Sequence, residues 1–199
     1  MYIHNVVILF PAALNHGDTV ALQTYTRKYW LSCGSRKCSR YSCPGMLMTG
    51  SDWTTCWGEV FQVYRASGPG QIHVGDLVGL HYPRGSIKWL GCRGVNCTKD
   101  TCPGQPTTAH GFASHEHWYR CWGEVFKIYS KNKSDGTIIN DGDDIMLYYL
   151  HDELWVAQDD GDTQKSPCAG TTRPPPLSKF DICPSETFTI WKKPFTAES

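Results

Sequence analysis

The chain has 199 residues, and its 19 basic and 19 acidic side chains give a formal net charge of zero. Balanced charge argues against bulk attraction to nucleic acid or to an anionic membrane, so any electrostatic binding has to be local. No run approaches the roughly 20 apolar residues that span a bilayer, and we expect no membrane span. Ten cysteines, with sequons at Asn96 and Asn132, predict a secreted, extracellular and disulfide-bonded glycoprotein.

The apolar run at residues 6–10 is too short for a signal-peptide core, lacks a basic flank and ends at Pro11. We interpret it as a strand. The rest of the chain consists of short alternating runs bounded by Gly, Pro, Asn or Asp, a pattern typical of an all-β protein.

A set of landmarks then recurs three times along the chain. A Gly-Asp pair begins each unit and an alternating apolar segment follows it. A tryptophan comes 13, 14 and 13 residues after the glycine, and a cysteine comes 13 residues after each tryptophan. The landmark residues are Gly17, Trp30 and Cys43; Gly75, Trp89 and Cys102; and Gly142, Trp155 and Cys168.

Each unit closes on a further cysteine, followed by a glutamate, a phenylalanine and a strand-like tail. These closing cysteines are Cys56, Cys121 and Cys183. So many landmarks in register indicate three homologous repeats, which we place at about 14–66, 72–131 and 138–193 within one domain over 1–199.

Three four-strand units around a pseudo-threefold axis resemble the β-trefoil superfamily, which includes ricin-type lectins, fascin-like proteins and growth factors of the fibroblast type. The resemblance implies an all-β fold with three pseudo-threefold repeats of four strands, stapled by disulfides within the repeats. The Gly-Asp, Trp and Cys-Pro-Gly pattern is also similar, more weakly, to secreted trefoil proteins of the cnidarian surface coat. The Gln-x-Trp motif of ricin-type sugar pockets is absent, because Lys28-Tyr29-Trp30 occupies the first corresponding stretch.

Comparison of the repeats predicts the disulfide pairing. Two cysteines of the first and second repeats have no counterpart in the third, where Gln158 and Thr163 occupy their places. Because the two cysteines are absent together from the third repeat, we infer that they are bonded to each other in the other two. The cysteine spacing does not match that of common zinc sites, so we expect no metal on cysteine. The predicted bridges are Cys33–Cys38, Cys43–Cys56, Cys92–Cys97, Cys102–Cys121 and Cys168–Cys183.

No nucleophile-base arrangement, phosphate loop or metalloprotease motif is visible, so we expect no enzyme and no cofactor. Residues that recur in every repeat are expected to serve the fold. They include the turn aspartates Asp18, Asp76 and Asp143, for which sugar binding is the alternative to a turn role.

Function is therefore sought where the repeats differ. Sugar recognition needs aromatic faces and a few fixed polar groups, and such residues follow the first strand of each repeat. The candidate carbohydrate-binding residues are Tyr25, His81, Tyr82, Tyr148, Tyr149, His151 and Asp152.

The small disulfide hairpins of the first two repeats carry basic residues that could bind a sulfated polysaccharide or another polyanion. These residues are Arg36, Lys37, Arg40, Arg93 and Lys99. The leading hypothesis is a secreted, non-enzymatic, lectin-like protein whose partners are glycans or glycoproteins. The alternatives are a protein-binding toxin, inhibitor or signalling ligand, and a structural matrix or surface-coat protein.

Overall fold

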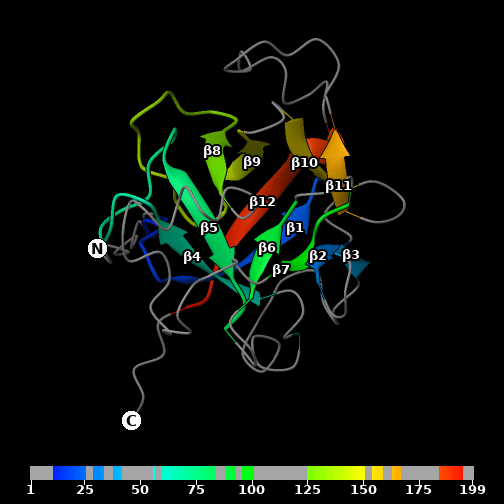
Figure 1. Cartoon of the computed structure of the whole chain (residues 1–199). Helices are drawn as coiled ribbons and strands as arrows, with labels where there is room; N and C mark the ends of the chain where they lie inside the picture. Colours follow the sequence, from blue (N-terminus) through cyan, green and yellow to red (C-terminus); the bar gives the residue numbers. More distant parts are fainter. Residues whose placement is uncertain are drawn as a thin grey trace, which may run out of the picture.

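The strands of the structure follow directly from the alternation in the sequence. In the first of them Val20 and Leu22 are fully buried in the main core, and Ala21 between them lies on the opposite face. The structure is a computed structural model of the chain (Figure 1). It describes residues 11–25, 29–33, 38–41, 56, 60–83, 88–92, 96–100, 125–150, 154–158, 163–166 and 184–194, with the backbone alone at 39–41, 99–100 and 163–166.

Six of the described strands pair in a closed antiparallel cycle and so form a barrel. The order of pairing around the barrel is β1, β4, β5, β8, β9, β12 and back to β1. Figure 1 shows the blue β1 beside the red β12, which comes from the other end of the chain. The barrel strands are β1 (Thr19–Thr24), β4 (Val60–Arg65), β5 (Leu77–His81), β8 (Phe126–Ser130), β9 (Asp144–Tyr149) and β12 (Thr187–Lys192).

The other described strands form three hairpins, one in each third of the chain. They are β2 (Trp30–Ser32) with β3 (Ser39–Tyr41), β6 (Trp89–Gly91) with β7 (Thr98–Asp100), and β10 (Leu154–Gln158) with β11 (Thr163–Ser166). A single turn of 3₁₀ helix, η3 (Pro184–Glu186), precedes β12. The all-β class is confirmed. The finer prediction of a β-trefoil is corrected to the architecture that the pairing shows, a closed six-stranded barrel with added strands.

Three short segments meet in a ring of backbone hydrogen bonds. The amide of Leu14 donates to the carbonyl of Ile139 at 2.8 Å, the amide of Ile72 donates to Leu14 at 2.8 Å, and the amide of Ile139 donates to Ile72 at 2.9 Å. All three side chains are fully buried. The ring therefore satisfies buried polar groups that would otherwise be costly, and it ties the three parts of the chain together.

The recurring Gly-Asp pairs connect this ring to the barrel. Gly17, Gly75 and Gly142 all have a positive φ (86°, 94° and 81°), a conformation that favours glycine. Each following aspartate accepts a hydrogen bond at its carboxylate from the backbone amide three residues before it, with distances of 2.6, 2.9 and 2.8 Å for Asp18, Asp76 and Asp143. The turn interpretation of these aspartates is confirmed, as is the core interpretation of Trp30, Trp89 and Trp155, each at most 1% exposed.

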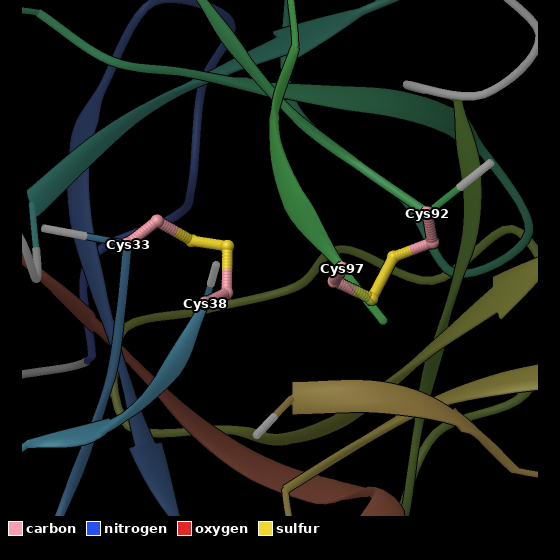
Figure 2. Close-up of a disulfide and its surroundings, with 4 residues drawn as sticks. All are labelled: Cys33, Cys38, Cys92 and Cys97. Carbon is pink, nitrogen blue, oxygen red and sulfur yellow. A yellow bond between two sulfur atoms is a disulfide. The ribbon is translucent and has the colours of Figure 1, made fainter. Parts of the chain in front are cut away.

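The structure confirms two of the five predicted disulfides, Cys33–Cys38 and Cys92–Cys97 (Figure 2). Their cysteines are fully buried, and the amide of Cys38 donates to the carbonyl of Cys97 at 2.9 Å, so the two hairpins lie side by side. In the third hairpin Gln158 lies directly opposite Thr163, at the position of the missing bridge. Cys56 is also disulfide-bonded. The predicted pairings of Cys43, Cys102, Cys121, Cys168 and Cys183 fall on residues outside the described ranges.

The third hairpin supplies a test of what a small disulfide contributes. Replacing Cys33→Gln together with Cys38→Thr gives the first hairpin the residues of the third. We expect the protein to fold, with the free energy of unfolding lowered by about 2 kcal/mol, because closing a loop of this length restricts the unfolded chain by about that amount. Denaturant unfolding measures the change. The double variant Cys92→Gln with Cys97→Thr is the matched control and should show a similar loss. An unchanged free energy of unfolding in either double variant would contradict the prediction.

Candidate functional site

The outer face of the barrel repeats a row of four residues three times, and each row crosses three neighbouring strands and ends one residue beyond a fourth. We call these rows the outer ladders. The first contains Gln23, Thr189, Asp144 and Lys131, the second contains His81, Gln62, Thr19 and Lys193, and the third contains Tyr148, Lys127, Leu77 and Ala66. Because the backbone contacts are equivalent, differences in chemistry between the ladders come from the side chains alone.

The first outer ladder is the most polar of the three. The hydroxyl of Thr189 donates to Oδ1 of Asp144 at 2.7 Å, and Nε1 of Trp191 donates to Oε1 of Gln23 at 2.9 Å. Gln23 and Thr189 are buried at 2% exposure, whereas Asp144, Lys131 and Trp191 are partly exposed. The ladder thus has a fixed hydrogen-bonded floor with a carboxylate, an ammonium group and an indole near its surface.

Tyr25 lies at the edge of this ladder, in the turn that follows β1. It is 40% exposed, the one large hydrophobic side chain among the described residues that is classed as exposed. The Nζ atom of Lys131 lies 5.6 Å from the centroid of the Tyr25 ring. Lys131 follows β8 and Tyr25 follows β1, and β9 and β12 lie between these two strands in the barrel.

The second outer ladder contains a buried histidine in an aromatic cluster. The ring of His81 lies 4.8 Å from that of Trp89 and 5.9 Å from that of Tyr64, and His16 in turn contacts Tyr64 at 5.0 Å. Both ring nitrogens of His81 are buried, with no hydrogen-bond partner found for them. Burial lowers the pKa of His81 to about 4, so the imidazole is neutral at physiological pH.

Burial also shifts the neighbours of His81. Desolvation lowers the pKa of His16, and the charge of Arg65 acts in the same direction. The Nδ1 atom of His16 accepts a hydrogen bond from the amide of Arg65. Desolvation raises the pKa of Tyr64, whose hydroxyl donates to Oε1 of Gln62. Gln23 holds the position of His81 in the first outer ladder, and it accepts a hydrogen bond from Trp191. The tyrosine beside His81 is Tyr64, whose hydroxyl donates to Gln62 instead.

The third outer ladder has little chemistry of its own. Tyr148 is 3% exposed and packs against Trp155 with ring centroids 4.7 Å apart. Leu77 and Ala66 complete the row and pack against a small apolar cluster. Lys127 lies 5.3 Å over the ring of Tyr129, itself only 5% exposed.

Most of the predicted sugar-binding aromatics therefore hold the core. Tyr82 and Tyr149 point into the barrel, at 3% and 0% exposure, and pack against Phe61 and Phe126. Together with the buried His81 and Tyr148 they present no open ring face, so Tyr25 alone among the described candidates is available for stacking. His151 and Asp152 lie outside the described residues.

The structure gives less information on the predicted polyanion site. Arg36, Lys37 and Arg93 lie outside the described residues. For Arg40 and Lys99 the backbone is described, and they occupy equivalent positions opposite Leu31 and Leu90 on neighbouring hairpins. Sequence reasoning missed Lys131, Asp144, Thr189 and Gln23, because only the pairing of four strands distant in the chain brings them together.

Within the described residues, no group of three or more His, Cys, Asp or Glu side chains is arranged to hold a metal ion. The described part of the chain likewise contains no helix with the length and apolar character needed to cross a membrane. The disulfides are compatible with an extracellular protein.

Comparison with known proteins shows fold likeness without a family. No protein-family model matches the chain, and no curated protein matches it. An SDF2-like protein from Arabidopsis thaliana matches in structure with a TM-score of 0.55 and 12% identity, over 90% of this chain and 94% of that one. An arabinofuranosidase complexed with arabinofuranosyl-α-1,2-xylobiose matches with a TM-score of 0.57 and 9% identity, over 92% of this chain and 32% of the enzyme.

These findings correct the resemblance drawn from the sequence. The predicted assignment to the β-trefoil superfamily, with ricin-type lectins, fascin-like proteins and fibroblast-type growth factors, and more weakly to cnidarian surface-coat proteins, does not stand. The two solved structures named above are described as other kinds of protein, and at such low identity they show the fold alone.

The buried histidine gives a prediction for stability against pH. The folded-state pKa of His81, about 4, lies below its ordinary value of 6.5. Between those values the unfolded chain binds a proton that the folded chain does not, so stability is lost as the pH falls from about 6.5 to about 4. The variants His81→Gln and His81→Tyr carry the residues of the equivalent positions, and we expect them to lose less stability over this window. Thermal unfolding at several pH values measures the slope; equal slopes for wild type and both variants would contradict the assignment to His81.

Proposed function

We propose that the protein is a secreted, non-enzymatic carbohydrate-binding protein, and that Tyr25 with the first outer ladder forms its sugar site. The observation that carries the proposal is the structural match to an arabinofuranosidase crystallised with an oligosaccharide. That match covers 92% of this chain but only 32% of the enzyme, so the chain spans about a third of the length of that protein.

The chemistry of the first outer ladder supports the same function. Sugar recognition uses an aromatic face against C–H surfaces together with a few oriented polar groups. Tyr25 offers the face, Asp144 offers a carboxylate oriented by Thr189, and Trp191 offers a partly exposed indole fixed by Gln23. A site of this composition would bind by stacking and hydrogen bonding and would need no bond-breaking machinery.

A glycan array with the oxidised protein at two salt concentrations tests the proposal. Binding that free sugar competes away is the expected result. Binding that vanishes at high salt for every ligand would move the site to the basic hairpins. A blank array would overturn the proposal in favour of a protein-binding or matrix role.

Variants of Tyr25 locate the site. We expect Tyr25→Ala to weaken saccharide binding by roughly tenfold, since a lost stacking contact of about 1–1.5 kcal/mol corresponds to that factor. Tyr25→Phe keeps the ring and should keep most of the affinity. His81→Gln is the control, because His81 is buried outside the first outer ladder. Calorimetric titration with the best array ligand measures all three; equal affinity of Tyr25→Ala and wild type would remove Tyr25 from the site.

A further inference from the structure

Trp191 is a partly exposed aromatic side chain beside the first outer ladder, at a distance from Tyr25. Its Nε1 atom donates to Oε1 of Gln23 at 2.9 Å. A Cβ atom placed on Gly142 would lie 3.7 Å from Cζ3 and 4.0 Å from Cη2 of the indole, so the six-membered ring lies against the bare backbone of that turn. The indole is therefore fixed at its N–H and supported at its far edge, while part of its surface stays open to solvent.

The residue after Trp191 anchors this end of β12. The amide of Lys192 donates to Oδ1 of Asp141 at 2.7 Å. Its Nζ atom donates to the carbonyl of Ala13 at 3.1 Å and pairs with Oδ2 of Asp18 at 2.8 Å. A side chain that is held in place before a ligand arrives loses little conformational entropy on binding, so the indole is a prepared platform.

The two aromatic side chains are spaced along β1. Trp191 lies opposite Ala21, and Tyr25 follows Ala21 by four residues. Four residues of strand correspond to about 13 Å of backbone. The first outer ladder, which contains Asp144, crosses β1 at Gln23, midway between those two positions. A single sugar ring is much smaller than this spacing, whereas a chain of sugar rings can cover it.

We propose that the sugar site binds an extended oligosaccharide of at least three rings along the junction of β1 and β12. The inference rests on the proposed function and adds its ligand class: one ring lies on Tyr25, another lies on Trp191, and a hydroxyl between them donates to Asp144. A carboxylate accepts several hydrogen bonds, and Thr189 supplies one of them. The contact between Lys131 and Tyr25 is retained, because the sugar uses the exposed part of the ring.

The other two outer ladders lack this pair of aromatic platforms. The place of the indole is held by Tyr64 in the second and by Tyr129 in the third, with exposures of 8% and 5%. The place of Tyr25 is held by Pro83 and by Leu150. Two partly exposed aromatic side chains on either side of a ladder therefore occur once among the three, and we expect one oligosaccharide per chain.

The test is calorimetric titration of the oxidised protein with neutral sugars of increasing length. The probes are xylose, glucose, mannose and N-acetylglucosamine, each with its linear oligosaccharides of two to five rings. For at least one series we expect the affinity to rise by roughly tenfold from one ring to three, because the second platform adds a stacking contact of that value. The affinity should then level off, with one site per chain.

Variants separate the two platforms. Tyr25→Ala and Trp191→Leu should each weaken trisaccharide binding by roughly tenfold. The two losses should add in the double variant, because the platforms are far enough apart to act independently. A single sugar ring reaches one platform, so at most one of the two variants should affect its binding.

Two further variants serve as controls. Tyr64→Leu makes the same kind of change at the equivalent position of the second outer ladder, and it should bind every probe as wild type does. Trp191→Tyr places at this position the residue of the other two ladders, so we expect it to fold. Its smaller ring does not reach over Gly142, and trisaccharide binding should weaken severalfold. Thermal unfolding establishes which variants are folded at the temperature of the titration.

The failures are distinguishable. Equal affinity of wild type for one ring and for three would overturn the extended ligand and leave carbohydrate binding intact. Unchanged trisaccharide affinity in either folded variant of Trp191 would remove the indole from the site. A loss in Tyr64→Leu as large as that in Trp191→Leu would assign the effect to altered packing and overturn the platform. Absence of binding to every saccharide would overturn both the extended ligand and the proposed function.

Discussion

The cyclic backbone contact among Leu14, Ile72 and Ile139 is the constraint on which the arrangement of this molecule depends. Three amides and three carbonyls, one of each from each third of the chain, satisfy one another in a place from which water is excluded. Unpaired, each would carry a desolvation cost of about 1–3 kcal/mol, so the three segments are stable there only together. The Gly-Asp turns that follow then set the start of each first strand, because the glycine amide bonds to the closing strand and the aspartate bonds back to the segment in the ring.

A threefold backbone with unequal side chains explains why one face of the barrel stands apart. The outer ladders share their hydrogen-bond register, yet the first holds Gln23, Thr189 and Asp144 where the third holds Tyr148, Lys127 and Leu77. The first outer ladder also spans the junction of β1 with β12, so its residues come from both ends of the folded chain. Its geometry therefore depends on closure of the barrel, and any change that loosens this closure acts on the site as well.

The sequence predicted the turn aspartates, the buried tryptophans and the two small disulfides, because each leaves a residue type at a fixed spacing. It failed for the aromatic residues after the first strand, although the alternation contained the signal. The side chains of Val78 and Leu80 point into the core. Tyr82 follows Leu80 by two residues, so its side chain points to the same inward face. The site itself could not be predicted in this way. Lys131 meets Tyr25 only through the pairing of β8, β9, β12 and β1, and no local pattern encodes which strands become neighbours.

The two features that depart from the threefold pattern have opposite physical characters. His81 occupies the place of Gln23, but it lacks the indole partner that Gln23 has, so its polar atoms are buried at a cost to stability that grows in acid. Tyr25 instead keeps part of its ring in contact with solvent, where a ligand can use it. A buried group without a partner lowers stability without offering a surface, whereas an exposed ring face offers a surface to a ligand. For this reason we propose the binding site in the first outer ladder and expect the acid sensitivity to come from the second.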